Sequence, residues 1–324
     1  MEFRVCESCR SAYTTGSRCP SCQGSLSLVE PSFFVGRVFG KYRLEGVLGV
    51  GGMGVVYRAV HTVLNRPAAL KLLVPTLADE EFLKRFLREA QILGQLKHPN
   101  IVEVYDFDRS EWGAPYYVME YLTGETLRQV IARQGPDPDL SAYADLLPQI
   151  VSGLAYAHRT GLVHRDLKPD NIFVTRYDGG RAAKIIDFGI AKLLDAGAET
   201  SGLTTTGTVM GTLNYLAPEQ VLKEPVGPHT DQYALGLICA EMALGKAVRA
   251  GKTLGEICAV EIKKPLSLED LEAAAFPPQV RQAVLKATQP DPASRFPSVS
   301  AFLKAMGFAV TESLREPELS DAVA

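Results

Sequence analysis

Two short acidic segments near the middle of the chain constrain its fold more than any other feature. The first reads His164-Arg165-Asp166-Leu167-Lys168-Pro169-Asp170-Asn171, and the second reads Asp187-Phe188-Gly189. A carboxylate such as Asp166 can accept a hydroxyl proton, while Asn171 and Asp187 can hold Mg²⁺ against phosphate oxygens, provided that the fold brings the segments together. We therefore expect a phosphoryl-transfer site, the alternative being two acidic turns that occur by chance.

Length and charge narrow the class of protein. The 324 residues are 46% hydrophobic, which is enough for one large core with an appendage. The formal net charge of −3 gives no reason to expect a nucleic acid or an anionic membrane as partner. The sequence has neither an apolar run of membrane-spanning length nor an apolar stretch ahead of Cys6, so we expect a cytoplasmic protein without a membrane span.

Four cysteines near the N-terminus predict a metal site. They form two C-x-x-C pairs, Cys6 with Cys9 and Cys19 with Cys22, and each pair can offer two thiolates from one tight turn. The pattern over residues 6–28 resembles a small zinc ribbon, and we expect structural Zn²⁺ bound by all four thiolates. The alternatives are an iron site of the rubredoxin kind, a redox-active pair, and two chance pairs without a function.

The other two cysteines, Cys239 and Cys258, lie in apolar, helix-like surroundings and are expected in the core. We expect the chain to have four parts, of which the linker and the tail are suggested by their composition and the bounds of the large domain by the family resemblance given below. These are a zinc-ribbon-like module at 1–28, a linker at 29–41 whose Phe33 and Phe34 are expected to pack on the adjoining domain, a large domain at 42–307, and a short acidic tail at 308–324.

A glycine-rich run lies between two strand-like segments. The run is Gly49-Val50-Gly51-Gly52-Met53-Gly54, and the β-branched residues Val55 and Val56 come directly after it. In a dinucleotide-binding fold a helix would begin at these glycines, whereas β-branched residues predict a second strand. We therefore expect a hairpin that lays its backbone N–H groups over phosphates.

A lysine and a glutamate further along form a candidate ion pair. Residues 68–71 are expected to continue the sheet and end on Lys71, and residues 79–96 have helical periodicity and carry Glu89. Pairing with Glu89 would hold Lys71 in place to contact phosphates. Movement of the helix that breaks the pair would give an inactive state.

Together these segments resemble the eukaryotic-like (Hanks-type) serine/threonine protein kinases of bacteria. The resemblance extends from about Tyr42 to about Gly307 and rests on segments in the family's order, namely 49–56, Lys71, Glu89, 98–102, 164–171, 187–189 and 217–219. It implies an α+β, two-lobed protein kinase fold. A small β-rich lobe would carry one regulatory helix, a larger lobe would be helical, and ATP would lie between them.

The resemblance also implies roles for individual residues. Asp166 would be the catalytic base, Asn171 and Asp187 would bind Mg²⁺ (or Mn²⁺), and Lys168 would contact the transferred phosphoryl group. A lysine at this place followed by proline is typical of the serine/threonine class. The residues implied to form the ATP site are Leu48, Gly49, Val50, Gly51, Gly52, Met53, Gly54, Val55, Val56, Ala69, Lys71, Glu89, Met119, Glu120 and Leu122.

A Ser-, Thr- and Gly-rich segment between Gly189 and Ala217 has too little apolar content to order itself. Arg165 precedes the expected base, as in family members whose loop is ordered by a phosphate bonded to that arginine. Thr204 and Thr206 are therefore the candidate phosphosites, with Thr205 and Thr208 next, and an unmodified solvated loop is the alternative. By the same resemblance, Thr212 would contact Asp166.

Two more positions match structural anchors of the family. One is Asp231, and the other is Arg295, which we expect to pair with Glu219. The chain departs from the family pattern at residues 247–251, where Ala247-Val248-Arg249-Ala250-Gly251 stands in place of a Pro-Phe stretch, so the conformation of that loop is not predicted.

The expected function is ATP-dependent phosphorylation of Ser or Thr, on the chain itself and on protein substrates in a cytoplasmic signalling pathway. Autophosphorylation would be favoured by a homodimer. A pseudokinase scaffold that binds partners through its fold and its ribbon is the first alternative, and a kinase-fold enzyme for small molecules is the second. Every chemical position is filled, which favours an active protein kinase.

Overall fold

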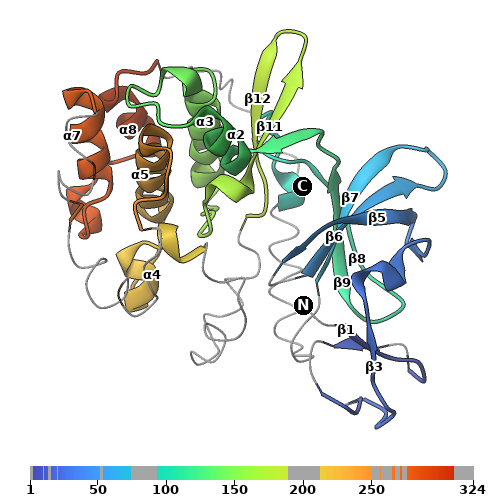
Figure 1. Ribbon diagram of the computed structural model, residues 1–324. Helices are drawn as coiled ribbons and strands as arrows, with labels where there is room; N and C mark the ends of the chain where they lie inside the picture. Colours follow the sequence, from blue (N-terminus) through green and yellow to red (C-terminus); the bar gives the residue numbers. More distant parts are fainter. Residues whose placement is uncertain are drawn as a thin grey trace, which may run out of the picture.

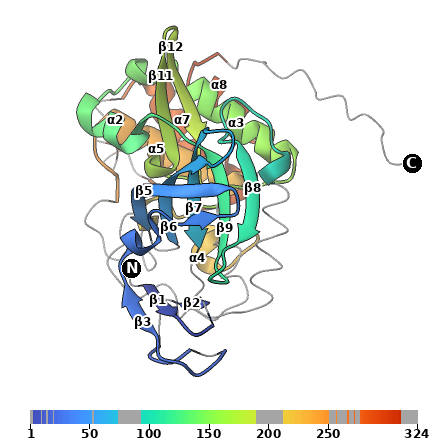
Figure 2. The ribbon, with the colours of Figure 1, turned by 90° about the vertical axis from the view of Figure 1, so that its right-hand side faces the viewer.

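The computed structural model of the chain separates into a β-rich part and a helical part (Figure 1). It describes residues 3–9, 11–13, 16–19, 21–51, 54–73, 93–188, 212–249, 256, 265–266, 271 and 276–309. Figure 2 shows a smaller sheet at one end of the β-rich part, formed by β1 (Phe3–Cys6), β2 (Ser11–Tyr13) and β3 (Ser27–Val29). Within the described ranges, no helix is both long and apolar enough to cross a membrane.

A six-stranded antiparallel sheet forms the β-rich part, with strand order β4-β5-β6-β7-β9-β8. Its strands are β4 (Val38–Phe39), β5 (Tyr42–Gly51), β6 (Gly54–His61), β7 (Pro67–Leu73), β8 (Val104–Arg109) and β9 (Pro115–Glu120). The β-branched residues after Gly54 lie in β6, which pairs with β5. The predicted hairpin is therefore confirmed.

Both faces of this sheet are covered. Because side chains alternate along a strand, Tyr116 and Val118 of β9 lie in one apolar cluster, whereas Tyr117 and Met119 lie in another. The cluster with Met119 continues into the helical part and forms the main core. Strand β9 thus carries side chains to both clusters.

The 3₁₀-helix η1 (Pro31–Phe34) anchors the segment ahead of β5. Phe34 is fully buried, and its ring centroid lies 6.1 Å from that of Trp112 and 6.5 Å from that of Tyr57. The Tyr57 hydroxyl donates a hydrogen bond to the Pro31 carbonyl oxygen at 2.8 Å. The expected packing of Phe33 and Phe34 on the adjoining domain is confirmed, since the Phe33 ring also lies 5.5 Å from Trp112.

The small N-terminal sheet, with strand order β2-β1-β3, rests on the same cluster. Val5 and Ala12 are buried together with Phe34 and Trp112. In addition, the Ala12 N–H donates to the Trp112 carbonyl oxygen at 3.0 Å. Since Trp112 lies between β8 and β9, the small sheet is joined to the β-rich part by apolar packing as well as by the chain.

Helix α5 (Pro228–Leu244) is the central helix of the helical part. Every residue from Thr230 to Leu244 is buried, as expected for a helix surrounded by other elements. These include Cys239, whose predicted core position is confirmed, whereas Cys258 lies outside the described residues. Other helical elements in the described part of the chain include α2 (Leu127–Gln134), η2 (Ser141–Tyr143), α3 (Leu147–Arg159), η3 (Pro169–Asn171), η5 (Thr212–Tyr215), α4 (Pro218–Leu222), α7 (Pro278–Ala287), η8 (Pro292–Ser294) and α8 (Val299–Ala305).

The connection between the two parts ends at a well-defined helix start. Thr126 caps α2, since its hydroxyl accepts from the Gln129 N–H at 3.3 Å and the Gln129 side chain accepts from the Thr126 N–H at 2.8 Å. A third sheet has β11 (Ile172–Tyr177) in the centre between β10 (Gly124–Thr126) and β12 (Gly180–Ile185). The position of the two acidic segments follows from this sheet, because the first segment ends where β11 begins and the second follows the end of β12.

Candidate functional site

The hairpin of β11 and β12 brings the two acidic segments together. Ile172 and Ile185 are paired, so the residues just beyond them, Asn171 and Ile186, are neighbours, and the Ile186 N–H donates to the Asn171 carbonyl oxygen at 2.9 Å. The His164 ring adds a second link, with Nε2 3.0 Å from the Ile186 carbonyl oxygen. The segments therefore lie side by side, as expected from the sequence.

Asp231 fixes the backbone of the first segment. From the first turn of α5, its carboxylate accepts hydrogen bonds from the N–H groups of His164 at 2.8 Å and Arg165 at 2.9 Å. Burial alone would raise the pKa of Asp231, but the hydrogen bond and charge of His158 outweigh burial and lower it. The buried carboxylate is thus ionised, and its predicted role as an anchor is confirmed.

Asp166 has polar partners on both sides. Lys168 Nζ donates to Asp166 Oδ2 at 3.0 Å, and Asn171 Nδ2 donates to the Asp166 backbone oxygen at 2.9 Å. Since its amide nitrogen points toward Asp166, Asn171 has its amide oxygen to offer to a metal ion.

Asp187 has an uncommon backbone conformation, with φ at 55°. Lys71 Nζ lies 2.6 Å from its Oδ1, and the Tyr117 hydroxyl donates to the same oxygen at 2.8 Å. Burial alone would raise the pKa of Asp187, but the charge of Lys71 and the hydrogen bonds from Lys71 and Tyr117 lower it. The site therefore holds an ionised carboxylate.

These donor atoms fit a magnesium ion. Mg²⁺ prefers oxygen ligands and is usually held in proteins by one or two side chains together with water and substrate phosphates. The carboxylate of Asp187 and the amide oxygen of Asn171 are of this kind. Glu89, the predicted partner of Lys71, lies outside the described residues, and among those described Lys71 pairs with Asp187.

The hairpin of β5 and β6 carries most of the residues that were predicted to cover a nucleotide. A Cβ atom on Gly54, where φ is 154°, would lie 2.1 Å from the Leu72 carbonyl oxygen, so this position requires glycine. Leu48 and Val50 are 49% and 47% exposed, as apolar side chains that cover a ligand are expected to be. Gly52 and Met53 lie outside the described residues.

The other predicted nucleotide-site residues lie on neighbouring strands and on the connection. Gly49 pairs with Val56, Val50 with Val55 and Gly51 with Gly54, while Ala69 of β7 pairs with Met119 of β9. The Glu120 carboxylate lies 2.6 Å from Lys184 Nζ, and Leu122 packs against the main core.

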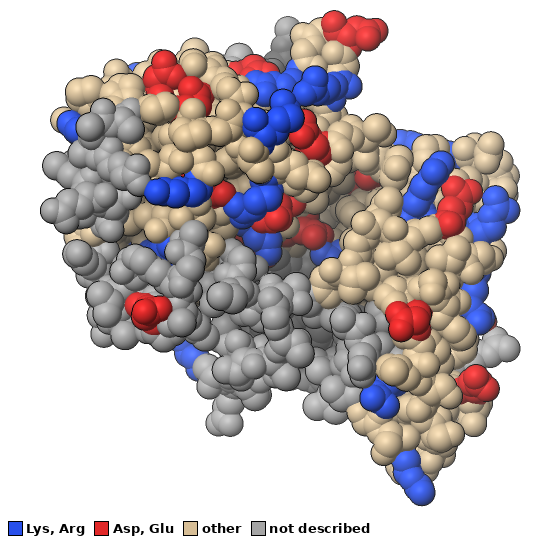
Figure 3. Space-filling view, in the orientation of Figure 1, with Lys and Arg blue, Asp and Glu red and all other residues tan. Residues whose placement is uncertain are grey.

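Charges of both signs meet where the helical part faces the β-rich part. Figure 3 shows basic and acidic side chains close together in the hollow between the two parts on this face. The pairs of Lys71 with Asp187 and of Lys168 with Asp166 have this mixed character. At this place the described lysines are therefore paired with carboxylates.

The predicted regulatory residues are described only in part. Thr204, Thr206 and the side chain of Thr212 lie outside the described part of the chain. Arg165 has φ at 63°, and its carbonyl oxygen accepts a hydrogen bond from Gln220 Nε2 at 2.7 Å. The first acidic segment is thereby tied to α4.

Arg295 and Glu219 form the predicted buried pair. Arg295 Nη1 and Nη2 each donate to one Glu219 carboxylate oxygen, both at 2.9 Å, and both side chains are almost completely buried. Burial alone would raise the pKa of Glu219, but the hydrogen bonds and charge of Arg295 lower it. The two-pronged geometry is the one that Arg makes best with a carboxylate.

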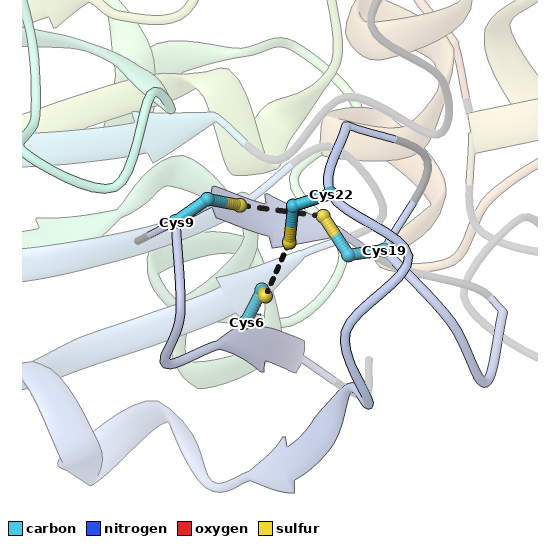
Figure 4. A group of neighbouring side chains, drawn as sticks. All are labelled: Cys6, Cys9, Cys19 and Cys22. Atoms are coloured by element: carbon cyan, nitrogen blue, oxygen red, sulfur yellow. Dashed lines mark hydrogen bonds between the residues drawn. The ribbon is translucent and has the colours of Figure 1, made fainter.

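All four N-terminal cysteine sulfurs point into one space (Figure 4). They lie within 4.8 Å of one another, with 3.4 Å between Cys6 and Cys22 and 3.4 Å between Cys9 and Cys19. A tetrahedral zinc ion with Zn–S bonds of about 2.3 Å would place sulfurs about 3.8 Å apart, so the spacing fits. Burial opposes ionisation of Cys19, but hydrogen bonds from Tyr13 and the backbone lower its pKa to about 6.

Three residues make important structural contacts that were not predicted from the sequence. Tyr117 contacts Asp187, and only the register between β7 and β9 would have pointed to it. Trp112 supports the small N-terminal sheet. Arg249, in the segment that departs from the family pattern, is fully buried and donates from Nη1 to the Leu216 carbonyl oxygen at 2.9 Å and from Nη2 to the Tyr233 hydroxyl.

Comparison with known proteins places the chain among kinases. The family model "Protein kinase domain" matches residues 42–305. The serine/threonine-protein kinase PknA of Mycobacterium tuberculosis is 38% identical over 286 residues, which are 87% of this chain and 64% of PknA. PrkC of Bacillus subtilis is 38% identical over 265 residues, which are 80% of this chain and 39% of PrkC. The chain thus spans less than two thirds of these relatives.

Solved structures agree with this assignment. The crystal structure of the Mycobacterium tuberculosis PknI kinase domain superposes with a TM-score of 0.64 and 29% identity, covering 84% of this chain and 97% of that domain. The matched region includes both acidic segments, the β5–β6 hairpin and the Glu219–Arg295 pair. The chain therefore belongs to the protein kinase family and has the two-lobed fold of that family.

Proposed function

We propose that the chain is a serine/threonine protein kinase that transfers the γ-phosphoryl group of Mg-ATP to Ser or Thr hydroxyls of itself and of protein substrates. The observation that carries the proposal is the β11–β12 hairpin, which brings Asp166 and Asn171 beside Asp187. The family match and the names of PknA and PrkC support the same reaction.

The proposal assigns a role in the reaction to five residues of the site. Bound Mg-ATP supplies the phosphoryl group and the cation that balances its charge. Asp166 accepts the proton of the substrate hydroxyl, while Lys168, whose Nζ is 3.0 Å from Asp166, contacts the transferred group. Asn171 and Asp187 hold the metal, and Lys71 binds phosphate oxygens.

No described position favours the pseudokinase alternative. The base, both metal ligands and the phosphate-binding lysine are present and lie together. The choice of Ser and Thr over Tyr rests on Lys168 and on the named relatives.

Incubation of the purified chain with γ-labelled ATP and a mixture of protein substrates tests this function. We expect phosphoserine and phosphothreonine, and no phosphotyrosine, after acid hydrolysis. Phosphopeptide mapping should place autophosphorylation at Thr204 and Thr206, where Arg165 is proposed to bind the phosphate. Label confined to tyrosine, or the absence of label on every protein, would contradict the proposal.

We further propose that the four N-terminal cysteines bind a structural zinc ion. The spacing of the four sulfurs supports thiolate ligation. Four thiolates leave no position for water or substrate, so the ion stabilises the module rather than taking part in chemistry. In a sheet this small, zinc contributes on the order of 10 kcal/mol to folding.

We expect one zinc per chain by metal analysis, and loss of zinc on mutation of Cys6 and Cys9 to Ser. Without zinc the free energy of unfolding of the module should fall by about 10 kcal/mol, the order expected for structural sites. Cys239→Ala is the matched control, because Cys239 is buried in α5 and should leave the zinc content unchanged. A red, iron-containing protein would support the iron alternative, and a metal-free protein with four reactive thiols would contradict metal binding.

The remaining assignments are also proposals. The kinase domain is placed at 42–307, the zinc module at 1–28, the connecting segment at 29–41 and the acidic tail at 308–324. A cytoplasmic location agrees with the use of ATP and with thiols that bind zinc instead of forming disulfides. A homodimer would allow one copy to phosphorylate Thr204 or Thr206 of the other, which a concentration dependence of autophosphorylation would reveal.

A further inference from the structure

Two strands deliver hydrogen-bond donors to the same oxygen of Asp187. Lys71 of β7 and Tyr117 of β9 are directly opposite each other in the antiparallel register, so their side chains lie on the same face of the sheet. Lys71 Nζ is 2.6 Å and the Tyr117 hydroxyl 2.8 Å from Asp187 Oδ1. Among the described residues none donates to Oδ2, the other carboxylate oxygen, which is then available to a metal ion.

The Tyr117 hydroxyl is held firmly in place. Tyr117 is only 3% exposed, and its ring centroid lies 5.7 Å from that of Phe107, which packs against the main core. A phenol hydroxyl is a neutral hydrogen-bond donor, and here it donates to Asp187 Oδ1 at 2.8 Å. The donor is therefore a fixed, neutral part of the core rather than a flexible surface group.

Lys71 and Tyr117 differ in charge, and so they respond differently to a metal ion bound at Asp187. The Lys71 ammonium repels a metal ion and, in the proposed reaction, serves the phosphates. The hydroxyl carries no net charge and can keep its hydrogen bond to Oδ1 while Oδ2 faces the metal. Hydrogen bonds of this kind orient metal-binding carboxylates, and their loss typically weakens metal affinity about 10- to 100-fold.

We propose that Tyr117 is a positioning residue for the metal-nucleotide site, which orients the Asp187 carboxylate through a hydrogen bond to Oδ1. The left-handed backbone of Asp187, with φ at 55°, adds to the need for such support, because that conformation is unfavourable for a residue with a side chain. The inference rests on the proposed function, in which Asp187 binds the metal of Mg-ATP.

Tyr117→Phe tests the proposal, since it removes the hydroxyl and keeps the buried ring. Binding of Mn²⁺ with a non-hydrolysable ATP analogue is measured by electron paramagnetic resonance, and Mg²⁺-dependent thermal stabilisation is measured in parallel. We expect metal affinity in the ternary complex to fall about tenfold, as for the loss of a hydrogen bond to a charged group. At saturating Mg²⁺ the kcat should recover most of its value, so the loss appears in the KM for the metal.

Tyr116→Phe is the matched control. Tyr116 is the neighbouring residue on β9, equally buried, but its ring lies in the other apolar cluster. It should therefore leave metal affinity unchanged. In an Asp187→Asn background, Tyr117→Phe should have no further effect on metal binding, because the two residues act through one contact.

Three outcomes are decisive. If the wild-type chain binds no metal-nucleotide complex, the proposed function itself fails. If the wild type binds and Tyr117→Phe binds equally well or more tightly, with unfolding temperatures that match in the absence of ligand, the positioning role alone is wrong. A drop in affinity shared by Tyr116→Phe would likewise overturn it.

Discussion

Phosphoryl transfer by an Asp166→Asn variant is expected to be about 10²- to 10⁴-fold slower than by the wild type, the range for loss of a positioned general base. The amide cannot accept the substrate proton, yet its oxygen can still accept the hydrogen bond from Lys168 Nζ, which is 3.0 Å from Asp166 in the structure. The fold should persist. The rate is measured as initial incorporation of labelled phosphate at saturating ATP.

Asp178→Asn is the control for this variant. Asp178 lies at the exposed turn between β11 and β12, so Asp178→Asn removes the same charge from a neighbouring part of the chain without touching the site. Its rate should equal that of the wild type. Full activity of Asp166→Asn, or equal losses in both variants, would remove Asp166 from the role of base.

The Arg295→Met variant is expected to lose about 3–5 kcal/mol of its free energy of unfolding, the usual effect of breaking a buried ion pair. The two guanidinium–carboxylate hydrogen bonds of 2.9 Å disappear, and Glu219 is left charged in the core. Arg295 also donates to the backbone oxygens of His229 and Pro290, which would lose their partner. Urea unfolding monitored by circular dichroism measures the loss.

The difference in the free energy of unfolding between Arg295→Met and the wild type should become smaller as the pH is lowered. In the wild type the pKa of Glu219 is lowered below its ordinary 4.5, so the pair contributes stability above that pH and loses it as the pH falls further. Without Arg295, burial instead raises the pKa of Glu219, so Glu219 is protonated at a higher pH than in the wild type, and the variant then no longer contains an unpaired buried charge.

Two further variants separate the pair from a general effect of losing an arginine. Glu219→Gln should recover much of the stability of Arg295→Met, because no buried charge remains. Arg176→Met removes an exposed arginine, 67% accessible and 3.7 Å from Glu125, and should change stability by less than about 1 kcal/mol. Equal losses in Arg176→Met and Arg295→Met would contradict the argument.

Much of the fold can be predicted from local sequence signals. The β-branched residues after Gly54 predict β6. The two acidic segments can be predicted to lie close together, because phosphoryl transfer needs both of them and a hairpin of the strands between them brings them together. The pairing of Arg295 with Glu219 was accessible only through the family resemblance, since the residues are far apart in the chain. No rule of sequence spacing predicts a contact between residues that are so far apart in the chain.

The contacts that were missed depend on register and tertiary packing. Tyr117 reaches Asp187 only because β9 pairs with β7 so that Tyr117 stands opposite Lys71, and a shift by one residue would turn it to the other face. Cysteine spacing predicted that the four sulfurs gather, but nothing in Val5 or Ala12 indicated that their sheet would settle on Trp112. Alternation identifies a buried face without identifying what buries it.

The seating of the small N-terminal sheet on Trp112 bears on how this kinase can be handled as a recombinant protein. A fragment beginning at Tyr42 would lack Val5, Ala12 and Phe34, and so would leave Trp112 facing water together with part of the cluster beneath it. Surfaces of this kind promote self-association and loss of solubility. A fragment trimmed to the catalytic domain would therefore expose an apolar patch on the small lobe, and the N-terminal residues cover this patch in the longer chain.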